Sequence, residues 1–355
     1  MNRENQVYEL VGISTLDYYE LYQTFTYINR ESYRLDYITS VELGEKKLSY
    51  DEYDSIASFY KKDFQKFMEY NVRDVELVKK LEDKMKLLEL AISLAYSAKV
   101  NFMDVFGQVR MWDCIIYHYL MEHNVVIPPK TSGKKEQQYA GAYVKEPIVG
   151  MHDWVVSFDL NSLYPHLIMQ YNISPETKVN VDEDDRFGIG VNNILNPDDE
   201  IYGIPCNKKL EILKNKGYSV AANGTCYTKK HLGFLPALME KLYKERKTYK
   251  QKMIECQKRQ QGGENLENEI TKYHNFQLVR KIQLNSAYGA IGNEFFRYYD
   301  VQMAEAITLS GQLSIRWIEK ELNEFLNETL KTKEIDYVIA SDTDSLYIRF
   351  GSLVN

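Results

Sequence analysis

Apolar residues recur every three to four positions along five stretches of the chain, a spacing that predicts amphipathic helices. These stretches span residues 67–100, 112–124, 235–260, 266–290 and 304–330. The first is long enough for one or two helices. Gly262 and Gly263 separate the third stretch from the fourth, so we predict that these two form a helical hairpin.

Shorter apolar runs rich in β-branched residues predict strands. The run "DWVVSFDL" predicts a buried strand that ends at Asp159. In "DYVIASDTDSLYIRF", two apolar runs surround a polar turn, which predicts a β-hairpin. The segment "AGAYVKEPIVG" predicts an extended stretch that is interrupted by Pro147.

Composition narrows the class of protein. The 355 residues can bury a sizeable core and are expected to form two to three domains. No run of 18 apolar residues occurs and the start "MNRENQVYEL" is polar, so we expect neither a membrane span nor a signal peptide. The four cysteines form no Cys-x-x-Cys pair, which argues against zinc and favours a reduced, intracellular setting.

The net charge of −7 speaks against nucleic acid only weakly, because binding depends on where the charges lie. Residues 241–259 contain eight basic and two acidic side chains. This stretch is a candidate anion-binding helix. A solvated surface face is the simpler interpretation of the stretch taken alone.

Three aspartates carry the candidate chemistry. Asp159 follows a predicted strand, where a carboxylate is often held for a metal, but a helix cap is an equally good interpretation. Asp342 and Asp344 flank the predicted hairpin turn, where aspartate is also favoured for local reasons. Positions i and i+2 of a strand point to one side, and two carboxylates held so close repel unless a cation lies between them. We therefore predict a Mg²⁺ site if Asp159 and Asp344 meet across neighbouring strands.

The predicted hairpin supplies a complementary surface. Lys281, Asn285 and Tyr288 stand at i, i+4 and i+7 and share one helix face. A cation, an amide and a ring in a row suit a nucleotide. On the facing helix, Arg246 and Lys250 would meet its phosphates. Core packing is the alternative for Tyr288, although the nearby glycines at 289 and 292 indicate close backbone approach.

Several motifs carry a resemblance to a known family. "DLNSLYP", "KIQLNSAYG" and "DTDS" follow one another along the chain, with the basic stretch between the first two. They resemble the first palm motif, the fingers motif and the second palm motif of family B DNA polymerases, especially those of large tailed bacteriophages. "YAGAYVKEP" resembles that family's linker between its exonuclease and polymerase parts. "YNVRDVELV", with Tyr70 and Asp74, resembles its third exonuclease motif.

The resemblance implies roles for individual residues. Asp159 and Asp344 would bind two Mg²⁺ ions, with Mn²⁺ as an alternative, and the carbonyl oxygen of Leu160 would be a further ligand. Asp342 would be a nearby catalytic carboxylate with a lesser role. The triphosphate would bind Arg246, Lys250 and Lys281, of which Lys281 also serves catalysis. Further nucleotide contacts would come from the residues Ser162, Leu163, Tyr164, Asn285 and Tyr288. Among these, Tyr164 would lie under the sugar and reject a ribose 2′-OH, and Asn285 and Tyr288 would line the nascent base pair.

The resemblance also implies an α/β (α+β) fold. It would comprise part of an RNase H-like exonuclease domain (1–86), a helical linker (87–138), a palm with an antiparallel sheet (139–235 and 294–355) and a two-helix fingers insertion (236–293). We expect the thumb to be absent and the chain to be a fragment or one piece of a split polymerase. The fingers are expected to open and close around the nucleotide.

The leading hypothesis is therefore a template-directed DNA polymerase core in the cytoplasm of the host cell. Its partners would be primer–template DNA, deoxynucleoside triphosphates, a complementary polymerase polypeptide and a sliding clamp. An alternative is an interaction subunit that binds DNA or a partner chain without turnover. A metal-dependent nuclease ranks last, because "SYDEYDS" is expected to be a loop and a lone Asp74, interpreted as a solvated helix residue, cannot hold two ions.

Overall fold

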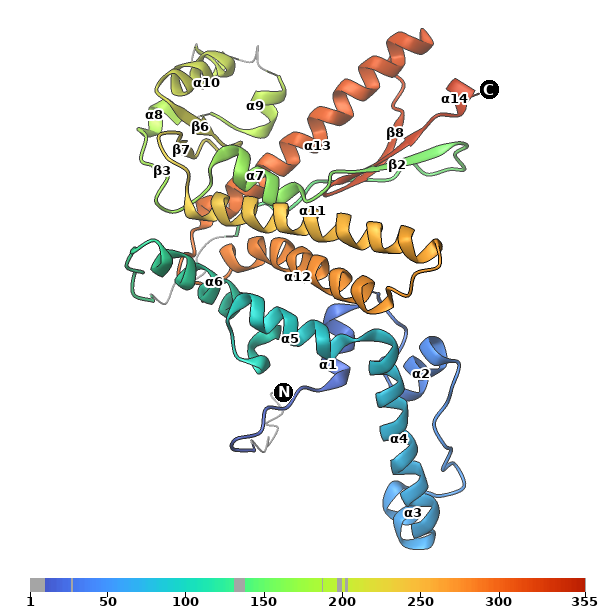
Figure 1. Ribbon diagram of the computed structural model, residues 1–355. Coiled ribbons are helices and arrows are strands. Elements are labelled where there is room, and N and C mark those ends of the chain that lie inside the picture. The colour runs from blue at the N-terminus through green and yellow to red at the C-terminus, as the bar shows by residue number, and fades with distance from the viewer. Residues whose placement is uncertain are drawn as a thin grey trace. The chain divides into compact units, whose positions relative to one another are not determined.

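The computed structural model describes residues 10–26, 28–130, 138–186, 188–196, 200–201 and 204–354 (Figure 1). The chain divides into two compact units, Met1–Gly107 and Gln108–Asn355, which are described separately. The combination of helices with antiparallel sheets confirms the predicted α/β (α+β) class in its general form. Within the described part of the chain, no helix is both long and apolar enough to cross a membrane.

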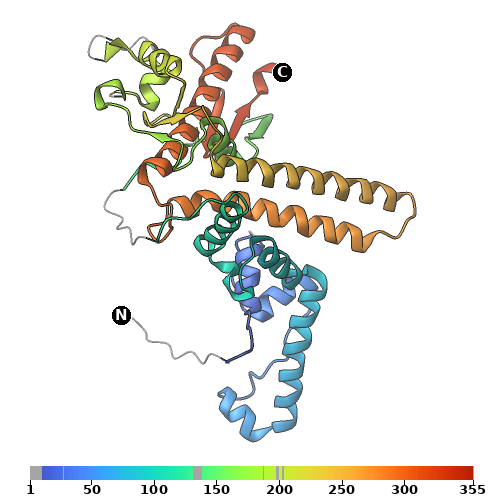
Figure 2. The same cartoon turned by 60° about the vertical axis from the view of Figure 1, so that its left-hand side comes forward.

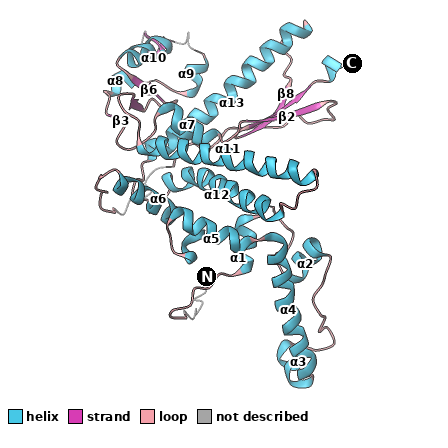
Figure 3. Cartoon of the chain, in the orientation of Figure 1, coloured by secondary structure: helices cyan, strands magenta, loops and turns pink. Residues whose placement is uncertain are grey.

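The regular elements among the described residues of the first unit are all helices, joined by loops (Figure 3). Its longest helices confirm the predicted helical stretch, which is divided in two because Lys86 adopts a left-handed φ of 56°. The loop predicted for "SYDEYDS" is present and leads into a helix that Ser55 caps. The elements are α1 (Tyr18–Phe25), α2 (Leu35–Leu43), α3 (Ile56–Lys62), α4 (Phe64–Met85), α5 (Leu87–Ala98) and the 3₁₀ helix η1 (Phe102–Phe106).

The second unit is built around five helices that share one apolar core. They are α6 (Gln108–Glu122), α7 (Leu163–Tyr171), α11 (Phe234–Gln261), α12 (Glu267–Ile291) and α13 (Val301–Leu330). The predicted hairpin is confirmed: α11 and α12 lie antiparallel along their length (Figure 2). The turn between them uses Gly263 at a φ of 101°, a conformation that favours glycine. Trp112 fixes α6 to α12 by donating its indole N–H to the Gln283 carbonyl oxygen and the Ser286 hydroxyl.

Shorter elements complete the second unit. A small antiparallel sheet in the order β3-β7-β6 packs with short helices on one side of α13 (Figure 1). These elements are β3 (Lys178–Val179), α8 (Glu183–Arg186), α9 (Val191–Leu195), β4 (Glu200–Ile201), β5 (Ile204–Pro205), α10 (Cys206–Asn215), β6 (Tyr218–Val220) and β7 (Cys226–Thr228).

The sheet that positions the candidate site has, among the described residues, four antiparallel strands in the order β1-β8-β9-β2. Its strands are β1 (Val144–Lys145), β2 (Val155–Asp159), β8 (Val338–Asp342) and β9 (Ser345–Arg349), and the short helix α14 (Gly351–Val354) follows. The predicted strand and hairpin are thus confirmed. Helix α13 covers β8 and β9 through a core that includes Ile315, Leu326, Val338, Leu346 and Ile348.

One prediction about this sheet is wrong. The strand that ends at Asp159 was expected to be buried, but every residue of β2 is exposed. The reason is topological, because β2 is an edge strand and α13 does not extend over it. Apolar, β-branched composition predicts strand formation, but it does not tell whether another element covers the strand.

Candidate active site

The register of β2 and β9 brings the two separated aspartates together. Asp159 lies opposite Ser345, and one step further the Leu160 N–H donates to the Asp344 carbonyl oxygen at 2.8 Å. Asp159 and Asp344 therefore occupy adjoining positions although they are 185 positions apart in the sequence (344 − 159). The meeting of these residues across neighbouring strands, on which the predicted metal site depended, is present.

The turn between β8 and β9 is unusually tight. The Asp344 N–H donates to the Asp342 carbonyl oxygen at 2.6 Å, which closes a three-residue γ-turn around Thr343. Thr343 has a φ of 55°, a strained value for a β-branched residue. Asp344 thus lies in the turn rather than in a strand, so the simple i, i+2 argument for a shared side of one strand does not apply to this pair.

The carboxylates repel one another. The pKa of Asp344 is raised, first by its partial burial and then by the nearby negative charge of Asp159, with a smaller effect of Asp342. A bound cation would relieve this repulsion. Among the described residues no three His, Cys, Asp or Glu side chains form a metal-binding group. The site therefore offers the two carboxylates Asp159 and Asp344, with backbone oxygens, rather than a three-acid cluster.

Local turn chemistry does not account for Asp159. Helix α7 has Ser162 at its N-cap position and no side-chain cap hydrogen bond, so the alternative role of Asp159 as a cap is excluded. Asp342 is partly engaged locally, since its carboxylate accepts a hydrogen bond from the Thr343 hydroxyl at 3.0 Å.

Arg246 is the basic residue of α11 that reaches the loop after β2. Its guanidinium donates to the Ser162 hydroxyl at 3.1 Å, while its buried Nε has no hydrogen-bond partner. Burial lowers the pKa of Arg246. The left-handed φ of 54° at Ser162 contributes to placing this hydroxyl. Most other bases of the basic stretch, including Lys247 and Lys250, are exposed, so the solvated-face interpretation holds for them and not for Arg246.

Three tyrosines lie next to one another, and one of them, Tyr164, lies near Asp344. The rings of Tyr164 and Tyr288 are 4.8 Å apart, and the Tyr288 hydroxyl lies 3.3 Å from that of Tyr139. The pKa of Tyr164 is raised by burial and then by the charge of Asp344, which places this ring near the turn. Tyr288 is half-buried and belongs partly to the core, so both of its predicted roles are compatible with its position.

Glycines make room for these rings. A Cβ on Gly292 would lie 2.6 Å from the Tyr139 hydroxyl, and one on Gly289 would lie 2.5 Å from Oε1 of Gln108, so the predicted close approach is confirmed. A Cβ on Gly311, in α13, would lie 3.1 Å from the Tyr164 ring. Sequence reasoning missed Gly311, although an isolated glycine inside a long helical pattern was a usable signal.

The remaining predicted nucleotide contacts are only partly gathered. Lys281 and Asn285 lie on the more exposed side of α12, half-buried and exposed respectively. Leu163 is different, because its side chain is buried against α13, and only its backbone is available to a ligand. Arg280 of α12, which sequence reasoning missed, joins α12 to α11 through a 2.9 Å ion pair with Glu245.

The first unit contains the exonuclease-like motif. Asp74 is not a solvated residue as expected: its side chain is 24% exposed and forms a 2.7 Å ion pair with Lys47. The Lys47 ammonium also lies 4.7 Å from the centre of the Tyr70 ring. Burial lowers the pKa of Lys47, but the hydrogen bonds and charge of Asp74 outweigh this effect and leave the pKa raised. The motif residues thus meet around a lysine.

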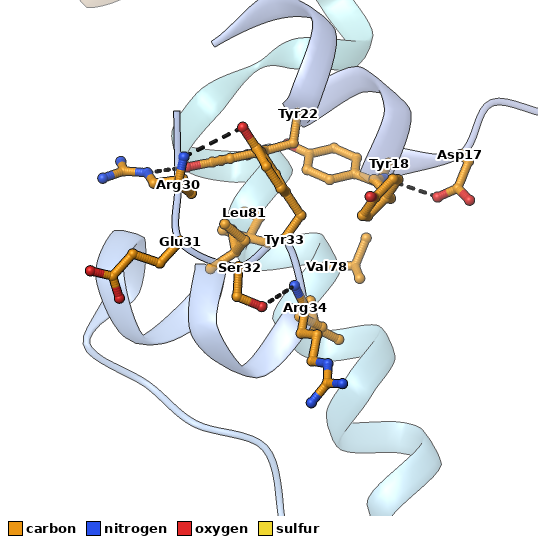
Figure 4. Close-up of a pocket in the computed structure, with 13 residues that line it drawn as sticks. Asp17, Tyr18, Tyr22, Arg30, Glu31, Ser32, Tyr33, Arg34, Val78 and Leu81 are labelled. Atoms are coloured by element: carbon orange, nitrogen blue, oxygen red, sulfur yellow. Dashed lines mark hydrogen bonds between the residues drawn. The ribbon is translucent and has the colours of Figure 1, made fainter. Parts of the chain in front are cut away.

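A cavity of about 600 Å³ opens elsewhere in the first unit (Figure 4). Its wall contains Tyr18, Tyr22 and Tyr33 together with Arg30. Arg30 is already paired with Glu42 at 2.7 Å and donates to the Tyr22 hydroxyl at 3.0 Å. The guanidinium of Arg30 and the hydroxyl of Tyr22 are therefore already paired, and the cavity belongs to a different unit from the paired aspartates.

The model of the family described as DNA polymerase family B matches residues 104–354. The DNA-directed DNA polymerase of Escherichia phage RB69 is 32% identical, over 100% of this chain and 42% of its own length. That of Enterobacteria phage T4 is 32% identical over 98% and 41%. The DNA polymerase delta catalytic subunit of Candida albicans is 24% identical over 98% and 31%. The chain therefore spans about two fifths of the length of its phage relatives.

Proposed function

The chain belongs to DNA polymerase family B, and from this premise we propose that it carries the catalytic core of a template-directed DNA polymerase. The reaction would transfer a deoxynucleotidyl group to a primer 3′-OH and release pyrophosphate. The observation that carries the proposal is the β2–β9 pairing, which joins Asp159 to the turn residue Asp344. Primer–template DNA and deoxynucleoside triphosphates would be the substrates.

The donor set fits divalent metal ions. Asp159 and Asp344 supply negatively charged oxygens that repel one another, and the Leu160 backbone joins the two segments. These two carboxylates and the Leu160 carbonyl oxygen would hold two Mg²⁺ ions, with Mn²⁺ as an alternative. When bound, such ions neutralise the charge that develops on the attacking and leaving oxygens. Asp342 is assigned a lesser role beside them.

The protein's own residues would position the triphosphate. Arg246 has a buried Nε without a partner, and an anion at this place would supply one. Lys250 and Lys281 would add charge from the two helices of the hairpin, with Lys281 nearest the reacting phosphate. Ser162 and the Leu163 backbone would complete this side. Charge and position are the protein's contribution, since phosphoryl transfer needs little else from it.

Sugar and base would contact the aromatic side of the site. Tyr164 would lie under the deoxyribose and exclude a 2′-OH by its bulk, held in place by contact with Tyr288 and by the space at Gly311. Asn285 and Tyr288 would line the nascent base pair. We assign the hairpin of α11 and α12 to the fingers and the four-stranded sheet to the palm, and the hairpin is expected to close over the nucleotide.

Primer extension by the full-length parent protein, or by this chain with its complementing polypeptide, tests the proposal. Asp344→Asn should lower the Mg²⁺-dependent rate by at least about 100-fold, because it removes charge where the transition state needs it. Tyr347→Phe, on the strand that follows Asp344 but without an assigned role, is the matched control. An unchanged rate for Asp344→Asn would contradict the assignment of this residue as a metal ligand.

A second function is a complementation-dependent subunit, which binds DNA or a partner polypeptide and has no turnover alone. One observation favours it: the edge strand β2 is exposed along its whole length. Activity of the isolated chain equal to that of the reassembled protein would exclude this alternative. A sliding clamp would be a further partner of the assembled enzyme.

We also propose that this chain alone has no exonuclease activity. The first unit, assigned to the end of an RNase H-like exonuclease domain, holds Asp74 in an ion pair with Lys47. This pairing neutralises the one carboxylate of the motif. Degradation of single-stranded DNA that Asp74→Asn abolished would contradict the proposal.

A further inference from the structure

The segment that follows α7 holds the beginning of α11 through three side chains. The first N–H groups of a helix have no partner inside the helix, and these side chains supply the missing acceptors. We call the three residues, Asn172, Ser174 and Glu176, the α11 socket. The hydrogen bonds run from the Gly233 N–H to Asn172 Oδ1 at 2.9 Å, from the Phe234 N–H to Glu176 Oε1 at 2.6 Å and from the Leu235 N–H to Ser174 Oγ at 3.4 Å.

The α11 socket is tightly built. Ser174 is buried, and its hydroxyl donates to the second carboxylate oxygen of Glu176 at 2.6 Å. A Cβ on Gly233 would lie 2.5 Å from the Ser174 Cβ, so a side chain there would force the two segments apart. Asn172 ends α7 with a left-handed φ of 57°, and its amide donates to two carbonyl oxygens of the loop before α11, at 2.7 and 2.9 Å. These contacts fix the end of α7 to the start of α11.

From the α11 socket onward, α7 and the first half of α11 lie side by side (Figure 1). They run in opposite directions, because the His166 ring lies 4.6 Å from the Tyr243 ring and the Arg246 guanidinium reaches the Ser162 hydroxyl at the other end of α7. Arg246 is 12 positions beyond Phe234 (246 − 234), or about 18 Å along the helix at about 1.5 Å per residue. A continuous helix therefore connects the socket to Arg246.

The α11 socket sets the rotation of α11 as well as its position. Successive residues of a helix are turned by about 100°, so acceptors for consecutive N–H groups define how the helix is rotated about its axis. A rotation by one residue would carry Arg246 away from Ser162 and bring the exposed Lys247 toward it. In the described structure the buried Nε of Arg246 has no hydrogen-bond partner, so the guanidinium is placed before an anion arrives.

We propose that Glu176 is a positioning residue for Arg246, which acts through the first turn of α11 and keeps the guanidinium in place for a polyphosphate. The inference rests on the proposed function, in which Arg246 binds the triphosphate. A carboxylate is a strong acceptor for N–H groups at the positive end of a helix dipole. An arginine that is fixed in advance binds an anion without first losing side-chain freedom, and this raises its affinity.

Glu176 is exposed, whereas Asn172 and Ser174 are buried, so Glu176 can be replaced without opening the core. Calorimetric titration of the chain with inorganic triphosphate, without metal or DNA, measures the effect apart from catalysis. Glu176→Ala should weaken binding by at least about threefold, in the range expected for a lost helix cap. Glu176→Gln keeps an oxygen acceptor for the Phe234 N–H and should retain most of the affinity.

Glu240→Ala is the matched control. It removes an exposed glutamate of the same helix, paired with Lys244 at 2.5 Å and outside the α11 socket. Because it also deletes one negative charge, it accounts for the general effect of charge on anion binding, and it should not weaken binding. Circular dichroism and thermal melts establish that all variants fold. A loss for Glu240→Ala equal to that for Glu176→Ala would overturn the inference.

A double-mutant cycle with Arg246→Ala separates positioning from general support of the fold. When Arg246 is absent, Glu176→Ala should cause no further loss, because the side chain through which Glu176 acts is missing. An equal loss in both backgrounds would mean that Glu176 only supports the fold, and would overturn the inference. Normal binding by Glu176→Ala beside weak binding by Arg246→Ala would also overturn it, but would leave the proposed function standing. Normal binding by Arg246→Ala would overturn the nucleotide assignment and the inference together.

Discussion

The Leu160 N–H donates a 2.8 Å hydrogen bond to the carbonyl oxygen of Asp344, and this contact joins the loop after β2 to the turn before β9. It has a functional consequence, because it fixes Asp159 and Asp344 at a separation that leaves their carboxylates in mutual repulsion. The backbone, rather than a side-chain network, therefore preorganises the site. Preorganised charge is the property that a metal-assisted phosphoryl transfer requires.

Divalent ions should stabilise the protein through these two carboxylates. Adding Mg²⁺ or Mn²⁺ is expected to raise the melting temperature, since an ion that binds only the folded state stabilises it by mass action. Asp344→Asn should abolish this increase, whereas Asp342→Asn should retain most of it. Differential scanning fluorimetry with and without the ions measures the effect. Equal metal-induced shifts in the wild type and in Asp344→Asn would contradict the assignment.

Arg246 should govern nucleotide affinity. Arg246→Lys keeps the charge but loses the planar fork that reaches both Ser162 and an anion, so KM for deoxynucleoside triphosphates should rise about tenfold or more. Lys247→Ala, at the adjacent exposed position of the same helix, should leave KM nearly unchanged. Steady-state primer extension at varied nucleotide concentration distinguishes the two. A similar KM in both variants would mean that Arg246 only supports the loop.

Much of this arrangement could be predicted from the sequence, because long helices and the hairpin turn produce strong local patterns. Apolar spacing predicted α11, α12 and α13, and the turn at Gly263 followed from its residues. The pairing of Asp159 with the β9 strand could be stated only as a condition, since register between distant strands leaves no local signal.

Other features depended on tertiary context. Nothing in "VVSFD" told whether a helix covers the strand, and β2 proved to be exposed. Likewise Lys47 and Asp74 are 27 positions apart (74 − 47), and their ion pair could not be read from either segment. Arg246 is a further case. Its Nε is buried while the other basic side chains of the stretch are exposed, and packing rather than residue type decides which of them is buried.

Tyr164 should control discrimination against ribonucleotides. Tyr164→Ala removes the ring expected to meet a 2′-OH, and incorporation of ribonucleotides relative to deoxynucleotides should rise by about 100-fold or more. Gly311→Ala should change the ratio less, because its Cβ would press on the ring at 3.1 Å and shift it only slightly. Competitive primer extension measures both ratios. Tyr171→Ala, on the same helix but without an assigned role, should leave the selectivity at the wild-type value if Tyr164 acts directly.

Lys145 should make the stability of the second unit depend on alkaline pH. Its ammonium lies 2.5 Å from both Glu319 and Asp336, and it thereby joins β1 to α13 and to the segment before β8. Burial lowers the pKa of Lys145, but hydrogen bonds and charge from these two acids outweigh it and raise the pKa above 10.5. Folding therefore favours the protonated form. The stabilisation is fully present below the pKa of an unfolded lysine and is lost as the pH rises through the higher value in the fold.

Lys145→Met tests this linkage. At neutral pH it should lower the free energy of unfolding by about 2 kcal/mol, less than the cost of breaking a fully buried pair because Asp336 remains partly in solvent. The difference from wild type should shrink at pH values above 10.5, where the wild type also loses the charge. Urea titrations across this range measure it, with Lys333→Met, an exposed lysine, as the control. A difference between wild type and Lys145→Met that stays constant up to the alkaline limit would show that the lysine stabilises through its methylene packing and not through its charge.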